Sequence, residues 1–204
     1  VYSFLEPHGL PRVANLRNGK WYGAHFDGDC YFKSTDGHHG QWNFSLSRLN
    51  LDMAKLAICR GGALIVDSTK QGKRFPDSFT ATIPIWCAII NYVMLYRSEN
   101  ESNDSTEKIE QNMNELLCTP EWINKSIRRR IVERCAAIAL ALPVSAVSLI
   151  RSSLMEEYKA NDKRFKPFRP LWVCPDEDGS IDWDGEGAEE LLEAFSSSGD
   201  LLCY

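Results

Sequence analysis

The sequence has no C-x-x-C pair, no long uninterrupted apolar run, and no lysine or arginine after Arg169. Its seven cysteines are scattered and odd in number, which argues against both a disulfide framework and a zinc knuckle. This pattern favours small buried thiols in a reducing compartment, so we expect a cytoplasmic protein. The longest apolar segment, Cys135 to Ile150, is interrupted by Pro143, and we therefore expect no membrane span.

Positive charge is missing from the last part of the chain. Residues 1–170 carry a net charge of +5 and the remainder carries −10, within a total of −5. A basic body with an acidic end is compatible with an anionic partner such as RNA, although many solvated surfaces show a similar pattern. At 204 residues, the chain can bury one core, or one core with a small appendage.

Short apolar runs alternate with helical patterns along the chain. We expect a hairpin with its turn at Asp27-Gly28-Asp29, a helix within Trp42 to Arg60 that ends at Gly61-Gly62, and a buried strand at Ala63 to Val66. Pro84 begins an apolar helix. This alternation predicts an α/β fold, a three-layer sheet-and-helix domain that is helix-rich in its second half. Further expected elements are a surface insertion at Ser98–Lys108, helices at Ser126–Leu142, Ser145–Lys159 and Ala188–Phe195, and strands at Leu171–Cys174 and Leu201–Tyr204.

Two stretches each combine a strand with a polar, glycine-containing, cationic loop. The first loop runs from Lys33 to Gly40 and reads KSTDGHHG, and the second runs from Asp67 to Arg74 and reads DSTKQGKR. Backbone N–H groups, hydroxyls and cations arranged in this way suit a phosphorylated ligand. The alternative for both loops is a plain turn with solvated cations.

These stretches resemble the initiator tRNA phosphoribosyl-transferase family of fungi and plants. The matching words are YFKSTDGH, QWNFSLSRLN, IVDST, GKRFPDSF and TIPIWCAIIN, with RPLWVCP and LLCY as later landmarks. The resemblance implies a glycosyltransferase (pentosyltransferase) that moves ribosyl 5-phosphate from phosphoribosyl pyrophosphate to the 2′-hydroxyl of the adenosine at tRNA position 64, in the T-stem. This tRNA modification would exclude initiator tRNA from elongation during translation. Mg²⁺, phosphoribosyl pyrophosphate and initiator tRNA are the implied cofactor and partners, and no oligomeric state is implied.

The resemblance also sets the expected domains. Residues 1–175 would form the phosphoribosyl-transferase N-terminal α/β domain, and residues 176–204 an acidic segment leading towards a phosphatase-like C-terminal domain that this sequence does not contain. The chain is thus expected to be a fragment or a natural short form. Lys70-Gln71 stands where the family has an arginine pair, and Ser78 to Thr82 lacks a family lysine, which bears on donor affinity.

Those departures leave alternatives open. The chain would be inactive by itself if the missing domain is required, and it would then act as a module that binds tRNA or the donor. A phosphate-ester binder unrelated to RNA is a third, weaker alternative.

Ribosyl transfer needs a neutralised pyrophosphate, a bound 5′-phosphate and a group that accepts the proton of the attacking hydroxyl. Asp67, at the end of an apolar strand, would bind Mg²⁺ or a ribose hydroxyl. Asp36 is the first candidate base and His38 the second, because imidazole titrates near neutral pH; exposed loop imidazoles are the alternative. The expected catalytic residues are Asp36, His38 and Asp67. The expected substrate-binding residues are Lys33, Ser34, Thr35, Gly37, Arg48, Ser68, Thr69, Lys70, Gly72, Lys73 and Arg74.

Candidates for RNA contact lie outside these two loops. Trp42 directly follows the first loop, and it is either a ring that stacks on a base or part of the core. A basic helix follows later, and its cations either bind RNA phosphates or form a solvated face. The residues of this helix that we expect to contact RNA are Lys125, Arg128, Arg129, Arg130 and Arg134.

Overall fold

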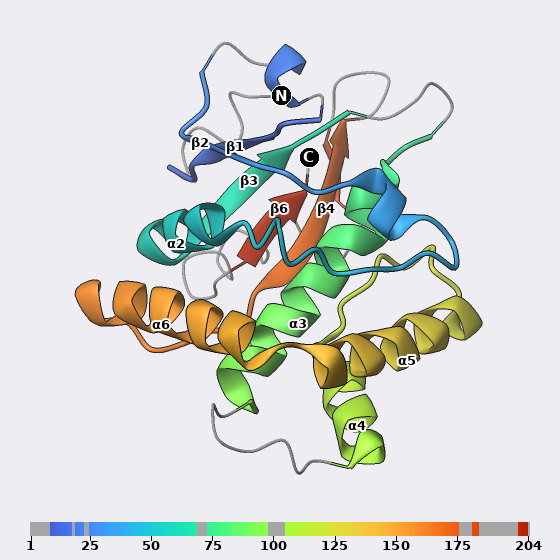
Figure 1. Ribbon diagram of the computed structural model, residues 1–204. Coiled ribbons are helices and arrows are strands. Elements are labelled where there is room, and N and C mark those ends of the chain that lie inside the picture. Colours follow the sequence, from blue (N-terminus) through green and yellow to red (C-terminus); the bar gives the residue numbers. More distant parts are fainter. Residues whose placement is uncertain are drawn as a thin grey trace.

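The computed structural model describes residues 9–17, 19–22, 25–68, 73–97, 105–175, 181–183 and 200–203. Within these residues, strands form a sheet against which helices pack, which confirms the predicted α/β class (Figure 1). The strands lie in the order β2-β1-β3-β6-β4-β5, and neighbours are parallel except for β4 and β5. The strands are β1 (Arg12–Asn15), β2 (Gly28–Cys30), β3 (Gly62–Val66), β4 (Arg169–Pro175), β5 (Ile181–Trp183) and β6 (Asp200–Cys203).

The helices form two layers on this sheet. α2 and α3 contact strands, whereas α4 and α5 pack on α3, and α6 contacts both α2 and α3 (Figure 1). The second half is helix-rich, as the sequence predicts. The helices are α2 (Leu51–Arg60), α3 (Ile83–Leu95), α4 (Thr106–Leu116), α5 (Lys125–Ala141) and α6 (Val144–Ala160), and the short helical segments are η2 (Gly19–Tyr22), η3 (Ser34–Gly37) and η4 (Ser78–Thr82).

Helix α3 is the centre of the core. Its sequence is apolar all round, and every residue from Ile83 to Met94 is buried. Pro84 lies in the first turn of α3, which continues directly from η4. The stretch Ser78–Leu95 is long and apolar enough to cross a membrane, but 89% of it is buried inside the protein. Here it serves as the central helix around which the other helices pack.

Two elements before residue 62 differ from the prediction. The hairpin is wrong, because Gly28–Cys30 form β2, which pairs in parallel with β1. The helix predicted within Trp42 to Arg60 begins only at Leu51, after Asn50, whose φ of 52° lies in the left-handed region. This helix ends as predicted at Gly61, whose φ of 83° favours glycine.

The end of the chain returns to the sheet. β6 lies between β3 and β4 and is parallel to both, so the sheet includes part of the segment 176–204 that the sequence analysis separated at residue 175. β4 and β6 confirm the two late strands. The helix predicted at Ala188–Phe195 and residues 98–104 of the predicted insertion lie outside the described residues. The predicted insertion extends too far, because α4 already begins at Thr106.

Candidate functional site

Three parallel strands end at the same edge of the sheet. β1 ends at Asn15, Phe32 follows β2, and Asp67 follows β3. The Asn15 side-chain amide donates to the Phe32 carbonyl (3.0 Å) and to Asp67 Oδ2 (2.7 Å), and the Phe32 N–H donates to Asn15 Oδ1 (2.9 Å). β1 and β3 are neighbours in the sheet. The chain continues from β1 to β2 on one side of this pair and from β3 to β4 on the other side. Ligands of open α/β sheets bind where two connections leave in opposite directions in this way.

The Asp67 side chain is buried at this edge of the sheet. It is 0% exposed, and Oδ2 accepts hydrogen bonds from Asn15 Nδ2 and from Ser78 Oγ (2.9 Å). Oδ1 accepts the Ser68 N–H (2.8 Å). Arg17 Nε lies 3.7 Å from Oδ2, and Arg17 Nη2 donates to the Ser68 carbonyl (2.8 Å). We call these five residues the Asp67 cluster.

The Asp67 cluster does not fit a metal site in which Asp67 is a direct ligand. The Asp67 side chain is 0% exposed and both of its oxygens already accept protein hydrogen bonds, so a Mg²⁺ ion could reach them only if this edge of the sheet opened. The part of the chain that the structure describes also contains no group of three His, Cys, Asp or Glu side chains that could hold a metal ion. Asp67 is therefore an anchor that joins β1, β3 and η4.

The rest of the second loop is only partly described. Thr69, Lys70 and Gly72 lie outside the described residues. Lys73 is exposed, and its Nζ lies 2.9 Å from Asp77 Oδ1. The Arg74 guanidinium lies 5.8 Å from the centre of the Phe75 ring. Lys73 and Arg74 thus have separate partners, and neither lines the surface pocket that lies beside the first loop.

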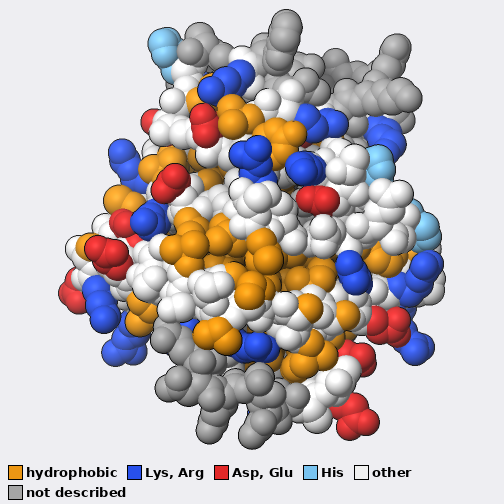
Figure 2. Space-filling model, viewed as in Figure 1, with side chains coloured by type: hydrophobic (Ala, Val, Ile, Leu, Met, Phe, Trp, Pro, Cys, Tyr) orange, Lys and Arg blue, Asp and Glu red, His pale blue; other side chains and the backbone are white. Residues whose placement is uncertain are grey.

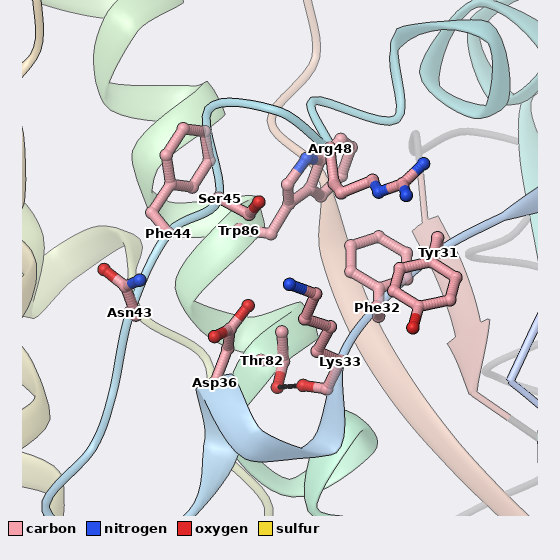
Figure 3. A pocket seen from close by; sticks show the side chains of 10 residues that line it. All are labelled: Tyr31, Phe32, Lys33, Asp36, Asn43, Phe44, Ser45, Arg48, Thr82 and Trp86. Atoms are coloured by element: carbon pink, nitrogen blue, oxygen red, sulfur yellow. Dashed lines mark hydrogen bonds between the residues drawn. The ribbon is translucent and has the colours of Figure 1, made fainter.

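The first loop opens onto a surface pocket, and the space of about 240 Å³ within it includes open solvent. Figure 3 shows Lys33 and Asp36 pointing into it, while Arg48 lies at its rim, with its guanidinium 4.8 Å from the centre of the Tyr31 ring. The pocket therefore brings together three residues that the sequence analysis selected. The complete lining is Tyr31, Phe32, Lys33, Asp36, Asn43, Phe44, Ser45, Arg48, Thr82 and Trp86.

The floor of this pocket is aromatic and rigid. The Phe32 and Trp86 rings meet edge to face, with centres 5.6 Å apart. Trp86 Nε1 donates to the Leu49 carbonyl (2.8 Å), which holds the indole beneath the opening. The Asn50 side chain exchanges hydrogen bonds of 2.9 and 3.3 Å with the Tyr31 backbone, much as a neighbouring strand would.

The turn that carries Asp36 is fixed to η4. Thr82 Oγ1 donates to the Lys33 carbonyl (2.8 Å). Gly37 packs so closely that a Cβ there would meet the Asp77 carbonyl and would lie 2.7 Å from Thr82 Oγ1. Only glycine fits this approach. Gly37 is buried, so its expected role in binding phosphate gives way to a role in packing.

The two candidate bases have different surroundings. Partial burial raises the pKa of Asp36, and the positive charge of Lys33 offsets part of that rise. His38 does not line the pocket, and its Nε2 lies 3.2 Å from Asp77 Oδ2, while Asp77 also pairs with Lys73. Asp36 faces the pocket and His38 lies beside it, with a carboxylate partner that orients its ring.

The remaining residues of the turn do not line the pocket either. Ser34 Oγ is buried and has no hydrogen-bond partner within the described residues. Thr35 is exposed, and its carbonyl accepts the His38 N–H at 3.3 Å. Ser34 and Thr35 therefore lie close to the pocket without contacting its interior.

Trp42 belongs to the core. It is 5% exposed, and its ring lies edge-on to His39, with ring centres 5.4 Å apart. Arg134 Nε donates to the Trp42 carbonyl (2.9 Å), and the Arg130 guanidinium lies 5.5 Å from the centre of the Trp42 ring. The core alternative is correct for Trp42, and these two arginines connect α5 to the segment after the first loop.

The other cations of α5 divide between structure and surface. Arg128 donates to Asn114 Oδ1 (2.5 Å) and to the Leu117 carbonyl (3.0 Å), so it joins α5 to α4. Lys125 is exposed, and the Arg129 side chain is 82% exposed beside Glu133 (3.0 Å). In Figure 2, imidazole, Lys and Arg side chains gather along the right-hand edge, over η3 and α5.

Sequence reasoning missed four residues that build the site. Asn15 carried a usable signal, since a polar residue at the end of a strand next to β3 lies at the ligand-binding edge. Trp86 and Thr82 lie in an apolar helical stretch and gave no such signal. Asp77 could not be predicted from a local pattern, because its partners His38 and Lys73 lie in different loops.

A family model described as the Rit1 N-terminal domain matches residues 3–194. The tRNA A64-2′-O-ribosylphosphate transferase of Saccharomyces cerevisiae is 37% identical to the chain over 205 residues, which cover 96% of this chain and 36% of that protein. An uncharacterized protein of Schizosaccharomyces pombe is 36% identical over 165 residues, or 80% of this chain and 33% of that protein. The chain thus spans about a third of the length of these curated relatives. No solved structure matches it.

Proposed function

Because the chain belongs to the Rit1 N-terminal domain family, as its matching words predicted, we propose that it carries a transferase site for ribosyl phosphate. The acceptor would be the 2′-hydroxyl of adenosine 64, in the T-stem of initiator tRNA, and the donor phosphoribosyl pyrophosphate. The protein would be a pentosyltransferase that acts in the cytoplasm and keeps initiator tRNA out of elongation. The name of the S. cerevisiae relative supports this proposal.

The observation that carries the proposal is the convergence of Lys33, Asp36 and Arg48 on one pocket. A carboxylate and an ammonium group inside the pocket, with a guanidinium at its rim, match the needs of the reaction, in which phosphate is bound and a proton is removed. Phe32 and Trp86, whose rings meet edge to face, give the pocket an apolar floor. The pocket is also held by backbone hydrogen bonds, so its groups are already positioned before substrate binds.

The proposed step moves one proton and one glycosidic bond. The 2′-hydroxyl oxygen attacks the anomeric carbon of the donor, and the bond from that carbon to the pyrophosphate oxygen breaks, so that pyrophosphate leaves with the electron pair. Asp36 accepts the hydroxyl proton; burial raises its pKa, which makes its carboxylate a stronger base. Lys33 and Arg48 bind the phosphate of the transferred group. His38 is the alternative base, oriented by Asp77.

Mg²⁺ stays a prediction for the donor, whose pyrophosphate would bring the ion. The Asp67 cluster does not fit a direct ligand role, and no step is assigned to the metal. The chain's own contribution at that edge is to hold β1, β3 and the strand end at Phe32 in register. This places Lys33, which follows Phe32, at the mouth of the pocket.

A second candidate function is a module that binds tRNA or the donor without catalysis. The closed state of Asp67 favours it, because the expected donor-binding carboxylate is turned inward. In that case the pocket would bind substrate, while turnover would need other parts of a longer protein.

A labelled transfer assay tests the proposal. The purified chain is incubated with Mg²⁺, phosphoribosyl pyrophosphate labelled in the ribose, and initiator tRNA; a matched tRNA has 2′-deoxyadenosine at position 64. We expect label on the first tRNA only. Asp36→Asn should lower the transfer rate about 10²- to 10⁴-fold, the usual contribution of a general base. Asp52→Asn, an exposed acid in the first turn of α2, should leave the rate unchanged.

The outcomes separate the two candidates. Saturable binding of the donor or tRNA without transfer, in a folded sample, would favour the binding module. Transfer that survives Asp36→Asn but is lost in His38→Ala would make His38 the base. Transfer to the deoxy tRNA would contradict the proposed acceptor.

A further inference from the structure

Trp122 differs in exposure from three other tryptophans of the chain. It is 44% exposed, whereas Trp42, Trp86 and Trp172 are all buried. It lies in the turn between α4 and α5, three residues before Lys125, the first residue of α5.

The Trp122 ring is held in place from two sides. It is parallel to the Phe75 ring, at 7° with centres 5.0 Å apart, and it meets Trp172 edge to face at 6.1 Å. Trp172 is fixed in turn, because its Nε1 donates to the Phe79 carbonyl (2.9 Å). The exposed indole is thus orientated by packing before any ligand arrives, which lowers the entropy cost of binding.

Cations of two segments are linked to this ring, one through Phe75 and two by their short separation from Trp122 in the sequence. Arg74 lies on Phe75, the ring on which Trp122 stacks. Lys125 and Arg129 lie one turn apart on α5, three and seven residues after Trp122, and both are exposed. Glu121 and Glu133 are the acids next to them in sequence, and Glu133 pairs with Arg129. Exposed aromatic rings among cations are typical of surfaces that bind single-stranded nucleic acid.

We propose that Trp122 stacks on an unpaired nucleobase of the RNA substrate, and that Lys125 and Arg129 bind the phosphates beside it. This inference rests on the proposed function, which supplies RNA as the ligand. It gives to Trp122 the stacking role that the sequence analysis assigned to Trp42. The surface comes from the α4–α5 turn and the Phe75 segment, and none of its residues lines the pocket.

Fluorescence anisotropy with a labelled single-stranded octamer of adenosine tests the proposal. Trp122→Ala should weaken binding about 5- to 150-fold, the usual effect of one stacked base. Trp122→Phe should retain most of the affinity, whereas Trp122→Leu, which stays apolar but cannot stack, should behave like Trp122→Ala. Tyr96→Ala is the matched control. Tyr96 is also an exposed aromatic residue, but it lies directly after the C-terminal end of α3 and outside the proposed RNA surface.

Two further measurements sharpen the test. A blunt RNA duplex, which has no unpaired base, should bind the wild-type chain and Trp122→Ala equally. The measured quantity is the slope of the logarithm of the octamer binding constant against the logarithm of the salt concentration. Lys125→Ala or Arg129→Ala should reduce the size of this slope by about 0.7 for each phosphate that the variant no longer binds, whereas Trp122→Ala should leave the slope unchanged. Thermal unfolding of each variant checks that the fold is intact.

Three results would overturn the inference. They are octamer affinity in Trp122→Leu equal to the wild type, Trp122→Ala within twofold of the wild type in a folded sample, and no binding of the octamer by the wild-type chain. Active ribosyl transfer alongside any of these would leave the proposed function standing. Conversely, a Trp122-dependent affinity without transfer would support the RNA surface and contradict the catalytic proposal.

Discussion

The Asp67 cluster and the Lys33–Asp36–Arg48 pocket come from stretches that look alike in sequence, yet they are built in opposite ways. In the Asp67 cluster, the carboxylate is fully enclosed and each oxygen accepts protein hydrogen bonds. In the pocket, the carboxylate and the ammonium group point into an open space. The Asp67 carboxylate is hydrogen-bonded and enclosed, so a ligand does not reach it, whereas the Asp36 carboxylate faces the pocket.

The two regions depend on each other through Asn15 and Phe32. Asn15 bonds Asp67 on one side and the Phe32 backbone on the other, and Lys33 follows Phe32 into the pocket. The closed region therefore sets the position of the open one. This division of labour predicts that changes in the Asp67 cluster act first on stability, and that changes in the pocket act first on binding and rate.

Asp67→Ala should have the largest effect on stability. The change leaves Asn15, Ser78 and the Ser68 N–H without their acceptor, and it leaves Arg17 without its carboxylate neighbour. We expect the free energy of unfolding to fall by about 3 to 5 kcal/mol, measured by urea denaturation.

Glu156→Ala is the control for this change. Glu156 is exposed on α6, and its removal should change the free energy of unfolding by less than about 0.5 kcal/mol. A folded Asp67→Ala variant of wild-type stability that no longer binds the donor would contradict the anchor role and return Asp67 to the donor site.

Gly37→Ala should have the next largest effect. A Cβ at this position meets the Asp77 carbonyl, which is backbone and cannot move aside cheaply. We expect a loss of about 1 to 3 kcal/mol in the free energy of unfolding and a shift of the turn away from Thr82. Calorimetric titration of phosphoribosyl pyrophosphate should show weaker binding at a temperature where the variant stays folded.

Thr35→Ala provides the comparison for Gly37→Ala. Thr35 lies in the same turn but is exposed, so neither stability nor donor affinity should change much. Equal donor affinity in Gly37→Ala and the wild type would show that the contact between the turn and η4 does not shape the pocket.

The sequence predicted the elements better than the contacts. Ala63 to Val66 reads as a buried strand, and the apolar run after Pro84 reads as a covered helix, because burial on all sides leaves a local signature. β2 was misassigned, since three residues pair in parallel with a strand far along the chain and Asp27-Gly28-Asp29 has the composition of a turn.

The site was predicted in part for the same reason. Lys33 and Asp36, which line the pocket, were selected because a polar loop after a strand is a local pattern, and Arg48 was selected as a nearby cation. The inward orientation of Asp67 could not be found, because it depends on Ser78 and Asn15, which lie 11 and 52 residues away. The burial of Trp42 likewise depends on arginines of α5, about 90 residues later.

Arg134→Ala tests the link between α5 and the pocket, with a smaller effect. Arg134 donates one hydrogen bond to the Trp42 carbonyl, next to Asn43 of the pocket lining. We expect the free energy of unfolding to fall by about 1 kcal/mol. Arg129→Ala removes only an exposed pair with Glu133 and should cost less than about 0.5 kcal/mol. Equal losses in the two variants, measured by urea denaturation, would contradict the link.

The smallest effect concerns the pH dependence of stability, and it separates the open carboxylate from the rest of the fold. Burial raises the pKa of Asp36 above its ordinary value of 3.8, so the folded chain still holds this proton at a pH where the unfolded chain has released it. Stability should therefore fall as pH rises from about 3.8 through the raised pKa, because the unfolded state binds fewer protons in that window.

Asp36→Asn removes this titration, so the variant should gain stability relative to the wild type across the window and keep the difference at higher pH. Urea denaturation of both proteins between pH 3 and pH 7 measures the difference, and other titrating groups cancel because both chains share them. A relative loss of stability in the variant with rising pH would mean that Asp36 is stabilised as an anion, like a closed structural carboxylate, and the contrast between the two regions would then fail.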